Sequence, residues 1–348
     1  MSTTRPSSRP MAPPPVADPS LATACRRVIE GALSVVPGES VVLLVDRDHA
    51  DVGEGFASAI YERNASSTTF VLEDLGPRGW NAVPPVVRAA LEMAQASILL
   101  IDIARNPELL LRRDIIDLAK GLGLRHAHLI GLSRQALLAG MTVDPMRVAE
   151  ATRTVRAKIL PSSKLAVRSP GGTALEVDLD ARYRWKLHTG AIRSGHWENL
   201  PSGLLLTHTS NVRGTFVADA CIMGRFAGHE GLLTTRPLRF EIENGVCRDI
   251  KCVDFALAQE VRRHLSSEAY LDRVGAVMLG TNVGLSQPLG ELLHDQCLPG
   301  LHLVFGYSHR EETGAPFCSR GILSATGAYA DVDLDGAPLV RRGRYLSW

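Results

Sequence analysis

Residues 39–46 read Glu-Ser-Val-Val-Leu-Leu-Val-Asp, a short continuous apolar run typical of a strand buried on both faces. Helical spacing follows over Val52–Arg63, and a second strand is predicted at Thr68–Asp74. The alternation continues with helices predicted at Val86–Gln95 and Asp114–Lys120 and strands at Ala96–Asp102 and His126–Gly131. Strands that alternate with helices of this length predict a parallel sheet with right-handed crossovers.

None of these strands is followed by a glycine-rich phosphate loop. The nearest candidate, Gly121-Leu-Gly123, precedes a strand and is typical of the C-terminal end of a helix. The predicted sheet therefore has no need of a nucleotide.

The pattern changes after a predicted connecting helix at Met146–Ile159. Short alternating strands follow, and two of them end in the hairpin signals Asn244-Gly245 and Asp335-Gly336. The strands are predicted at Ala174–Leu179, Phe240–Glu243 and Asp331–Leu334, with an amphipathic helix at Val253–Leu265. We therefore predict an α/β protein with a Rossmann-like parallel-sheet domain at residues 20–162 and a strand-rich α+β domain at residues 163–348, after a disordered proline-rich leader at residues 1–19.

Bulk composition excludes several classes of protein. The 348 residues carry a formal net charge of +1, which argues against a nucleic-acid or anionic-membrane partner. The six cysteines form no Cys-x-x-Cys pair, so neither a zinc ribbon nor a disulfide framework is indicated. The leader lacks the apolar run of a secretory signal, and no stretch approaches the ~20 apolar residues of a membrane span. We predict a cytoplasmic protein.

Four segments after Gly195 resemble the aminopeptidase-T type of metallo-aminopeptidase, the thermophilic leucyl-aminopeptidase group. They are Asn199-Leu-Pro-Ser-Gly203, Gly214-Thr-Phe-Val-Ala-Asp219, Gly280-Thr-Asn282 and the segment Asp295–Gly306, which contains Gly300-Leu-His302. The resemblance implies a cleft that accepts a peptide end, a pair of metal ions that polarise the scissile carbonyl, and a homodimer.

The resemblance also implies metal ligands that this sequence mostly lacks. The two expected glutamates are replaced by Leu204 and Ala276, and the expected His-x-Asp pair falls at Ile322 and Ser324. Only His302 keeps the family's residue type, with Asp295 as a nearby outer group. A catalytic zinc takes three protein ligands, and the single-iron dioxygenases of this fold need two histidines and a carboxylate. Both chemistries therefore lack their ligands, and we predict neither a metal nor another cofactor.

The sequence allows two other kinds of site. One is a relocated metal site, whose ligands could be His294, Asp295, His302, His309 and His208; the last lies on a predicted strand near the Asn-Leu-Pro loop. The alternative is that His302 is a relic in the wall of a cleft and that the other histidines are loop or surface residues. A cysteine nucleophile is disfavoured because Cys297 and Cys318 have no orienting third group. For His126 and His128, which share one face of a strand, a structural or surface role is expected.

The sequence thus predicts a non-catalytic, aminopeptidase-like protein that binds a peptide. Less closely, it resembles the aminopeptidase-like peptide-binding proteins of crocagin-type pathways, which implies a precursor peptide of a ribosomally made natural product as the ligand. The predicted binding residues are Asn199, Leu204, Asp219, Ala276, Asn282, His302 and Tyr307. The alternatives are a hydrolase or ring-modifying enzyme with a rearranged site around His302, and a structural partner of a catalytic paralogue.

Overall fold

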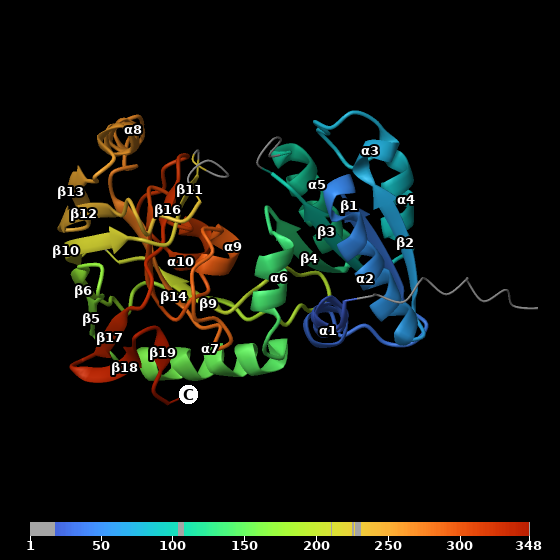
Figure 1. Cartoon of the computed structure of the whole chain (residues 1–348), viewed down its shortest axis with the longest axis horizontal. Coiled ribbons are helices and arrows are strands. Elements are labelled where there is room, and N and C mark those ends of the chain that lie inside the picture. The colour runs from blue at the N-terminus through green and yellow to red at the C-terminus, as the bar shows by residue number, and fades with distance from the viewer. Residues whose placement is uncertain (1–17, 104–107, 210, 225, 227–230, 348) are drawn as a thin grey trace, which may run out of the picture. The chain divides into compact units, whose positions relative to one another are not determined.

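A computed structural model describes residues 18–103, 108–209, 211–224, 226 and 231–347 (Figure 1). Of the predicted leader, residues 1–17 lie outside the described residues. The chain divides into two compact units. The first comprises residues 1–101, 108–128 and 192–197, and the second comprises residues 102–107, 129–191 and 198–348.

The first unit is built on a five-stranded sheet with strand order β2-β1-β3-β4-β8. Its strands are β1 (Ser40–Val45), β2 (Ser66–Val71), β3 (Ala96–Ile101), β4 (Arg125–Ile130) and β8 (Trp197–Asn199). Both β2 and β3 pair with β1 in parallel, and every residue of β3 is buried. The continuous apolar runs in the sequence therefore predicted this parallel sheet correctly.

The helices of the first unit precede or connect these strands. They are α1 (Pro19–Arg26), the π-helix η1 (Arg27–Ala32), the 3₁₀-helix η2 (Arg47–His49), α2 (Ala50–Glu62), α3 (Leu72–Leu75), α4 (Pro85–Glu92) and α5 (Leu109–Leu122). The strand predicted to run to Asp74 ends at Val71 instead, because the chain turns into α3 and buries Leu72.

The second unit packs two antiparallel sheets. The first has strand order β13-β12-β10-β6-β5-β17-β18-β19, and the second has strand order β11-β16-β15-β14-β9-β7. In chain order the strands are β5 (Lys164–Arg168), β6 (Ala174–Asp178), β7 (Lys186–His188), β9 (Leu204–Thr207), β10 (Asn211–Ala218), β11 (Ile222–Gly224), β12 (Leu238–Glu243), β13 (Val246–Lys251), β14 (Val274–Gly280), β15 (Gly300–Phe305), β16 (Leu323–Ala325), β17 (Asp331–Leu334), β18 (Ala337–Arg341) and β19 (Arg344–Tyr345).

The helices of the second unit are α6 (Arg134–Gly140), α7 (Pro145–Ile159), α8 (Phe255–Leu265), α9 (Leu292–Asp295) and α10 (Arg310–Thr313). The predicted helix near Val253 begins two residues later, where the Asp254 side chain accepts a hydrogen bond from the Leu257 amide and caps α8. Across the described part of the chain, no helix combines the length and apolar character that crossing a bilayer requires.

Both predicted hairpin turns are present. Asn244 and Gly245 take positive φ angles of 50° and 72° between β12 and β13, and Asp335 and Gly336 take 49° and 84° between β17 and β18. A two-residue turn with positive φ at both positions matches the twist of the strands that it joins. The short-range signals in the sequence were therefore sufficient for these two pairings.

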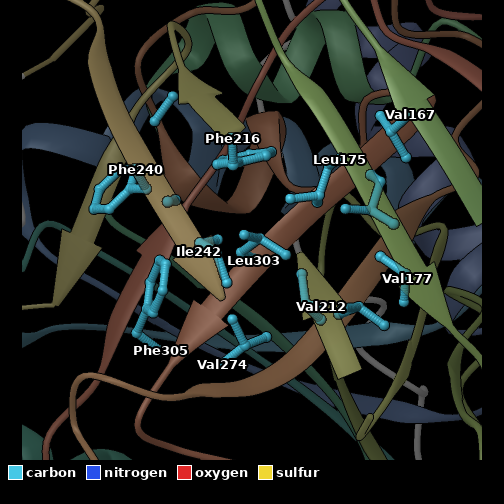
Figure 2. Packing of buried hydrophobic residues seen from close by; sticks show 14 of the residues in the cluster. Val167, Leu175, Val177, Val212, Phe216, Phe240, Ile242, Val274, Leu303 and Phe305 are labelled. Atoms are coloured by element: carbon cyan, nitrogen blue, oxygen red, sulfur yellow. The ribbon is translucent and has the colours of Figure 1, made fainter. Parts of the chain in front are cut away.

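The main core of the second unit lies between its two sheets (Figure 2). Phe240 on β12 stacks against Phe305 on β15 with ring centroids 5.1 Å apart, and this contact joins the two sheets. Leu303 and Val274 lie beside this pair, while Leu175 and Val177 contribute from β6. One face of the six-stranded sheet is thus committed to the core, which leaves the other face to form a site.

Candidate functional site

The opposite face of the six-stranded sheet gathers the positions where the family resemblance expects metal ligands. Successive strand residues point to opposite faces, so Leu205, Val277 and Leu303 enter the main core while their neighbours point away from it. These neighbours form a second cluster, which we call the apolar cluster: Leu204, Leu206, Ala276, Met278 and Val304, with Ile322 packed against them. Three of the four positions where the resemblance expects a ligand therefore meet in space.

The residues of the apolar cluster are buried. Leu204 is 5% exposed and Ala276 is fully buried. Ser324, the fourth position, is also buried and lies opposite Val304 in the register of β15 and β16. A carboxylate at either of the first two positions would be surrounded by hydrocarbon and would need an ion or another partner.

His302 lies on the same face and has both ring nitrogens engaged by the backbone. Its Nε2–H donates to the Leu298 carbonyl oxygen at 3.0 Å, and its Nδ1 accepts from the Gly327 amide at 3.3 Å. Because a carbonyl only accepts, Nε2 carries the proton and the imidazole is neutral. Burial lowers the pKa of His302 to about 4. Neither nitrogen offers a free lone pair to an ion in this arrangement.

His294 and Asp295 form a buried pair that anchors a loop. The carboxylate of Asp295 accepts from the Leu289 and Gly290 amides, both at 2.9 Å, and from His294 Nδ1 at 2.8 Å. The expectation that His294 is a loop or surface histidine is wrong, because it lies within α9 and is buried. Within the described ranges, no three or more His, Cys, Asp or Glu side chains are placed to hold a metal ion.

His208 follows β9 directly rather than lying on it. Its Nδ1–H donates to the Gly275 carbonyl oxygen at 2.7 Å, while its buried Nε2 has no hydrogen-bond partner among the residues that the structure describes. Its ring contacts Tyr183 and Phe317 edge to face, at centroid distances of 4.6 and 5.3 Å. His208 therefore belongs to an aromatic contact rather than to a set of metal ligands.

The polar residues predicted to orient a ligand have different environments. The Asn282 amide donates to the Ser202 carbonyl oxygen at 3.0 Å and accepts from the Gly284 amide at 3.1 Å, so it is occupied in holding its own loop. Asp219 accepts from the Ala328 amide at 2.7 Å, and burial raises the pKa of its carboxyl. Asn199 has a buried Oδ1 with no hydrogen-bond partner in the described part of the chain.

A crevice in the second unit lies beside Asn282. It encloses about 200 Å³, its open mouth included, and Ser202 supplies a second polar group to its wall. The remaining wall is mostly apolar and includes Met141, Val148 and Leu200. The enclosed part of the crevice measures about 10 Å³, which is room for about one water molecule.

A polar group borders the apolar cluster; sequence reasoning named two of its members, Tyr307 and His309, and missed the other three, Lys186, His188 and Glu312. Lys186 and His188 on β7 lie opposite Leu206 and Leu204 in the register, so they occupy the same face of the sheet. Lys186 Nζ forms an ion pair with Glu312 Oε1 at 2.6 Å. We call Lys186, His188, Tyr307, His309 and Glu312 the polar flank.

The two histidines of the polar flank are neutral at pH 7. Burial, and then the positive charge of Lys186, lowers the pKa of His188 to about 3 and that of His309 to about 4. The Tyr307 ring, 38% exposed, contacts the His309 ring edge to face at 4.8 Å. Alternating polar residues at 186 and 188 were the signal in the sequence, but their partner Glu312 lies 126 residues away along the chain.

The cysteines near these histidines make hydrogen bonds to backbone carbonyls. Cys297 donates to the Leu293 carbonyl oxygen at 3.4 Å, and Cys318 donates to that of Ser319 at 3.5 Å. Burial raises the pKa of the Cys297 thiol well above its usual range. A buried thiol held in its protonated form is not an activated nucleophile.

In the first unit, His126 and His128 belong to a buried chain of hydrogen bonds. Ser97 Oγ lies 2.9 Å from His126 Nδ1, His126 Nε2 lies 3.1 Å from His128 Nδ1, and Arg112 donates to His128 Nε2 at 3.4 Å. Burial lowers the pKa of His126 to about 3. Of the two roles expected, the surface role is wrong for both histidines, because both are buried.

Two solved structures share this fold. Aminopeptidase T from Thermus thermophilus aligns with a TM-score of 0.66 over 94% of this chain and 99% of its own length, at 16% identity. The fold is that of aminopeptidase T. A 2,5-dihydroxypyridine dioxygenase from Pseudomonas putida KT2440 aligns with a TM-score of 0.64 over 96% of this chain and 99% of its own, at 17% identity. No protein-family model and no curated protein matches the sequence.

These two neighbours bear the names of different enzymes although they share one fold. At identities of 16% and 17% the likeness to this chain shows the fold alone. Because one fold can support unrelated reactions, the chemistry must be argued from the residues of the site.

Proposed function

We propose that this chain is a non-catalytic, aminopeptidase-like protein that binds a peptide. In this proposal the aminopeptidase-T fold keeps its ability to accept a peptide and has lost the ion pair that would cleave it. The ligand would be a precursor peptide of a ribosomally made natural product, which the protein presents to modifying enzymes.

One observation carries the proposal: the apolar cluster occupies the positions where the family resemblance expects ligands. Leu204, Ala276 and Ile322 come from three separate parts of the chain and pack against one another. If only some of the ligands had been replaced, the remaining ones would be buried polar groups without partners, and each would lower the stability of the fold by about 1–3 kcal/mol. A packed hydrocarbon cluster removes that cost, so the face is stable without an ion.

His302 supports the same conclusion. Its ring is held between the Leu298 carbonyl and the Gly327 amide, and burial keeps it neutral. The histidine therefore has a structural role that explains its presence without a metal.

The polar flank supplies the groups that would contact a peptide. His188 and His309 have no hydrogen-bond partner for their rings within the described residues, and each neutral imidazole offers one donor and one acceptor. Tyr307 adds an exposed ring beside them. Leu204 and Ala276 are too buried to touch a ligand widely, so they would act as the floor beneath it.

A selection experiment tests this proposal. The full chain is used to select binders from a displayed library of random peptides, and recovered peptides are titrated by calorimetry and weighed by mass spectrometry after incubation. We expect saturable binding, unchanged peptide mass and sub-stoichiometric metal by elemental analysis. His309→Gln together with Tyr307→Ala should weaken binding about tenfold or more, equivalent to about 1.4 kcal/mol.

The matched control is His196→Gln, since His196 is exposed and lies in the first unit. A change of peptide mass would replace the proposal with a rearranged enzyme. Recovery of no peptide, together with a co-purifying subunit, would replace it with a structural partner of a catalytic paralogue.

A further inference from the structure

The polar flank contains more hydrogen-bond donors than its own residues use. Lys186 Nζ has three N–H groups and donates one of them to Glu312 Oε1 at 2.6 Å. Among the described residues, the Tyr307 hydroxyl and the rings of His188 and His309 have no hydrogen-bond partner. Because Tyr307 is 38% exposed and both histidines are half-buried, a ligand in solution can reach this group.

The charge of the polar flank can change in one direction only. Lys186 is positive and Glu312 is negative, so their ion pair is neutral. Each imidazole can take up a proton and become positive, whereas neither can become negative near pH 7. Burial, and then the charge of Glu312, raises the pKa of Tyr307, so its hydroxyl stays a neutral donor. The flank can therefore compensate an added negative charge and cannot compensate an added positive one.

The charged groups around the polar flank do not reverse this balance. Arg184 donates to the backbone carbonyls of Glu311 and Glu312 at 2.8 and 2.9 Å and has no carboxylate partner in the described part of the chain. Glu198 acts on Lys186, but burial raises its pKa and its carboxylate accepts a backbone hydrogen bond at 2.6 Å from the loop that precedes it. Glu311 is exposed, so solvent and salt screen its charge.

We infer that the polar flank binds a carboxylate of the ligand peptide, either its C-terminal carboxylate or an aspartate or glutamate side chain. Lys186 Nζ supplies the opposite charge, and Tyr307 and the two imidazoles donate hydrogen bonds. An ionised carboxylate only accepts hydrogen bonds, so it matches a group whose unused positions include several donors. The inference rests on the proposed peptide binding and adds the chemistry of the group that is recognised.

Small capped amino acids test the inference without a selected peptide. N-acetylglycine carries an α-carboxylate and N-acetylglutamic acid α-amide carries only a side-chain carboxylate, whereas N-acetylglycinamide is neutral and glycinamide is a cation. Each is titrated into the full chain at constant ionic strength, and the ring resonances of His188 and His309 are followed by NMR. We expect saturable shifts with the carboxylates alone and a rise in the pKa of both histidines, because a nearby anion favours the protonated ring. The carboxylate that binds more tightly identifies its source.

Substitutions of the ion pair have opposite signs for a carboxylate and for a cation. Lys186→Met should weaken carboxylate binding about tenfold because it removes the opposite charge, and Glu312→Gln should tighten it about threefold because it removes a like charge. Both side chains are partly exposed, so both variants should fold, as thermal melts would show. Arg182→Met, the matched control, removes a surface cation paired with Asp180 and should leave binding unchanged.

Preferential binding of glycinamide, or weaker carboxylate binding in Glu312→Gln, would overturn the inference. Absence of binding by both carboxylates would overturn it as well, and saturable binding of selected peptides would then leave the proposed function standing. Carboxylate binding without any recovered peptide would support the anion site and count against the proposed peptide binding.

Discussion

The two faces of the six-stranded sheet are made from alternate residues of the same strands but differ in what they contain. On one face, Leu205, Val277, Leu303 and Phe305 join a large core shared with the eight-stranded sheet. On the other face lie the small apolar cluster, the neutral His302 and the polar flank. Since side chains alternate, residues on one face can change without altering the other. This separation lets the positions where the family resemblance expects ligands be apolar while the core is kept.

The largest expected effect on stability comes from a substitution on the face that joins the core. Phe305→Ala should lower the free energy of unfolding by about 3–5 kcal/mol, because it removes a fully buried ring that joins the two sheets. Met278→Ala, on the apolar cluster, should cost about 2 kcal/mol, since that cluster is smaller. Denaturant unfolding measures both. Equal losses would mean that the two faces contribute alike and that the distinction fails.

A charge on the second face is the next largest effect. Leu204→Glu should destabilise the protein by about 3 kcal/mol because it places an unpaired carboxylate among hydrocarbon side chains. Leu204→Met, which conserves volume and adds no charge, should cost less than about 1.5 kcal/mol. If the glutamate is tolerated as well as the methionine, the face is more hydrated than its packing indicates.

Adding a second glutamate sharpens this test. With Leu204→Glu and Ala276→Glu together, Zn²⁺ should raise the melting temperature of the variant and leave that of the unaltered chain in place, because an ion that binds only the folded state stabilises it. A folded double variant that ignores Zn²⁺ would weaken the assignment of both positions as former ligand sites.

Lowering the pH should destabilise the protein through His302, which lies on the second face. The folded-state pKa of His302 is about 4, against an ordinary value of 6.5. As the pH falls below 6.5, the unfolded chain binds the proton first, so stability is lost between pH 6.5 and about 4. His302→Gln should reduce this pH dependence by up to about 1.4 kcal/mol per pH unit. His196→Gln, at an exposed position, should not change the slope; equal slopes in all three proteins would contradict the prediction.

The sequence predicted the features that depend on residues close together along the chain, and it missed those that depend on distant residues. The parallel strands and the turn at Asn244-Gly245 depend on neighbouring residues and were predicted correctly. The predicted end of β2 was wrong because one turn of helix, α3, replaces the last predicted strand residues. Positions in the apolar cluster were identified through the family resemblance and not from residue spacing, because its members come from four separate segments. Tyr307 and His309 of the polar flank were named from the sequence, but Lys186, His188 and Glu312 were missed because no local pattern links Lys186 to Glu312.

The smallest expected effect concerns that flank. Lys186→Met breaks a half-exposed ion pair with Glu312 and should change stability by less than about 1 kcal/mol. It also removes a positive charge that lowers the pKa of His188 and of His309, so both values should rise, as NMR titration of the imidazole protons would show. Arg182→Met, which removes a cation paired with Asp180 instead, should leave both values in place. If Lys186→Met also leaves them unchanged, burial alone keeps these rings neutral, and the polar flank has no electrostatic coupling through which a charged ligand could act.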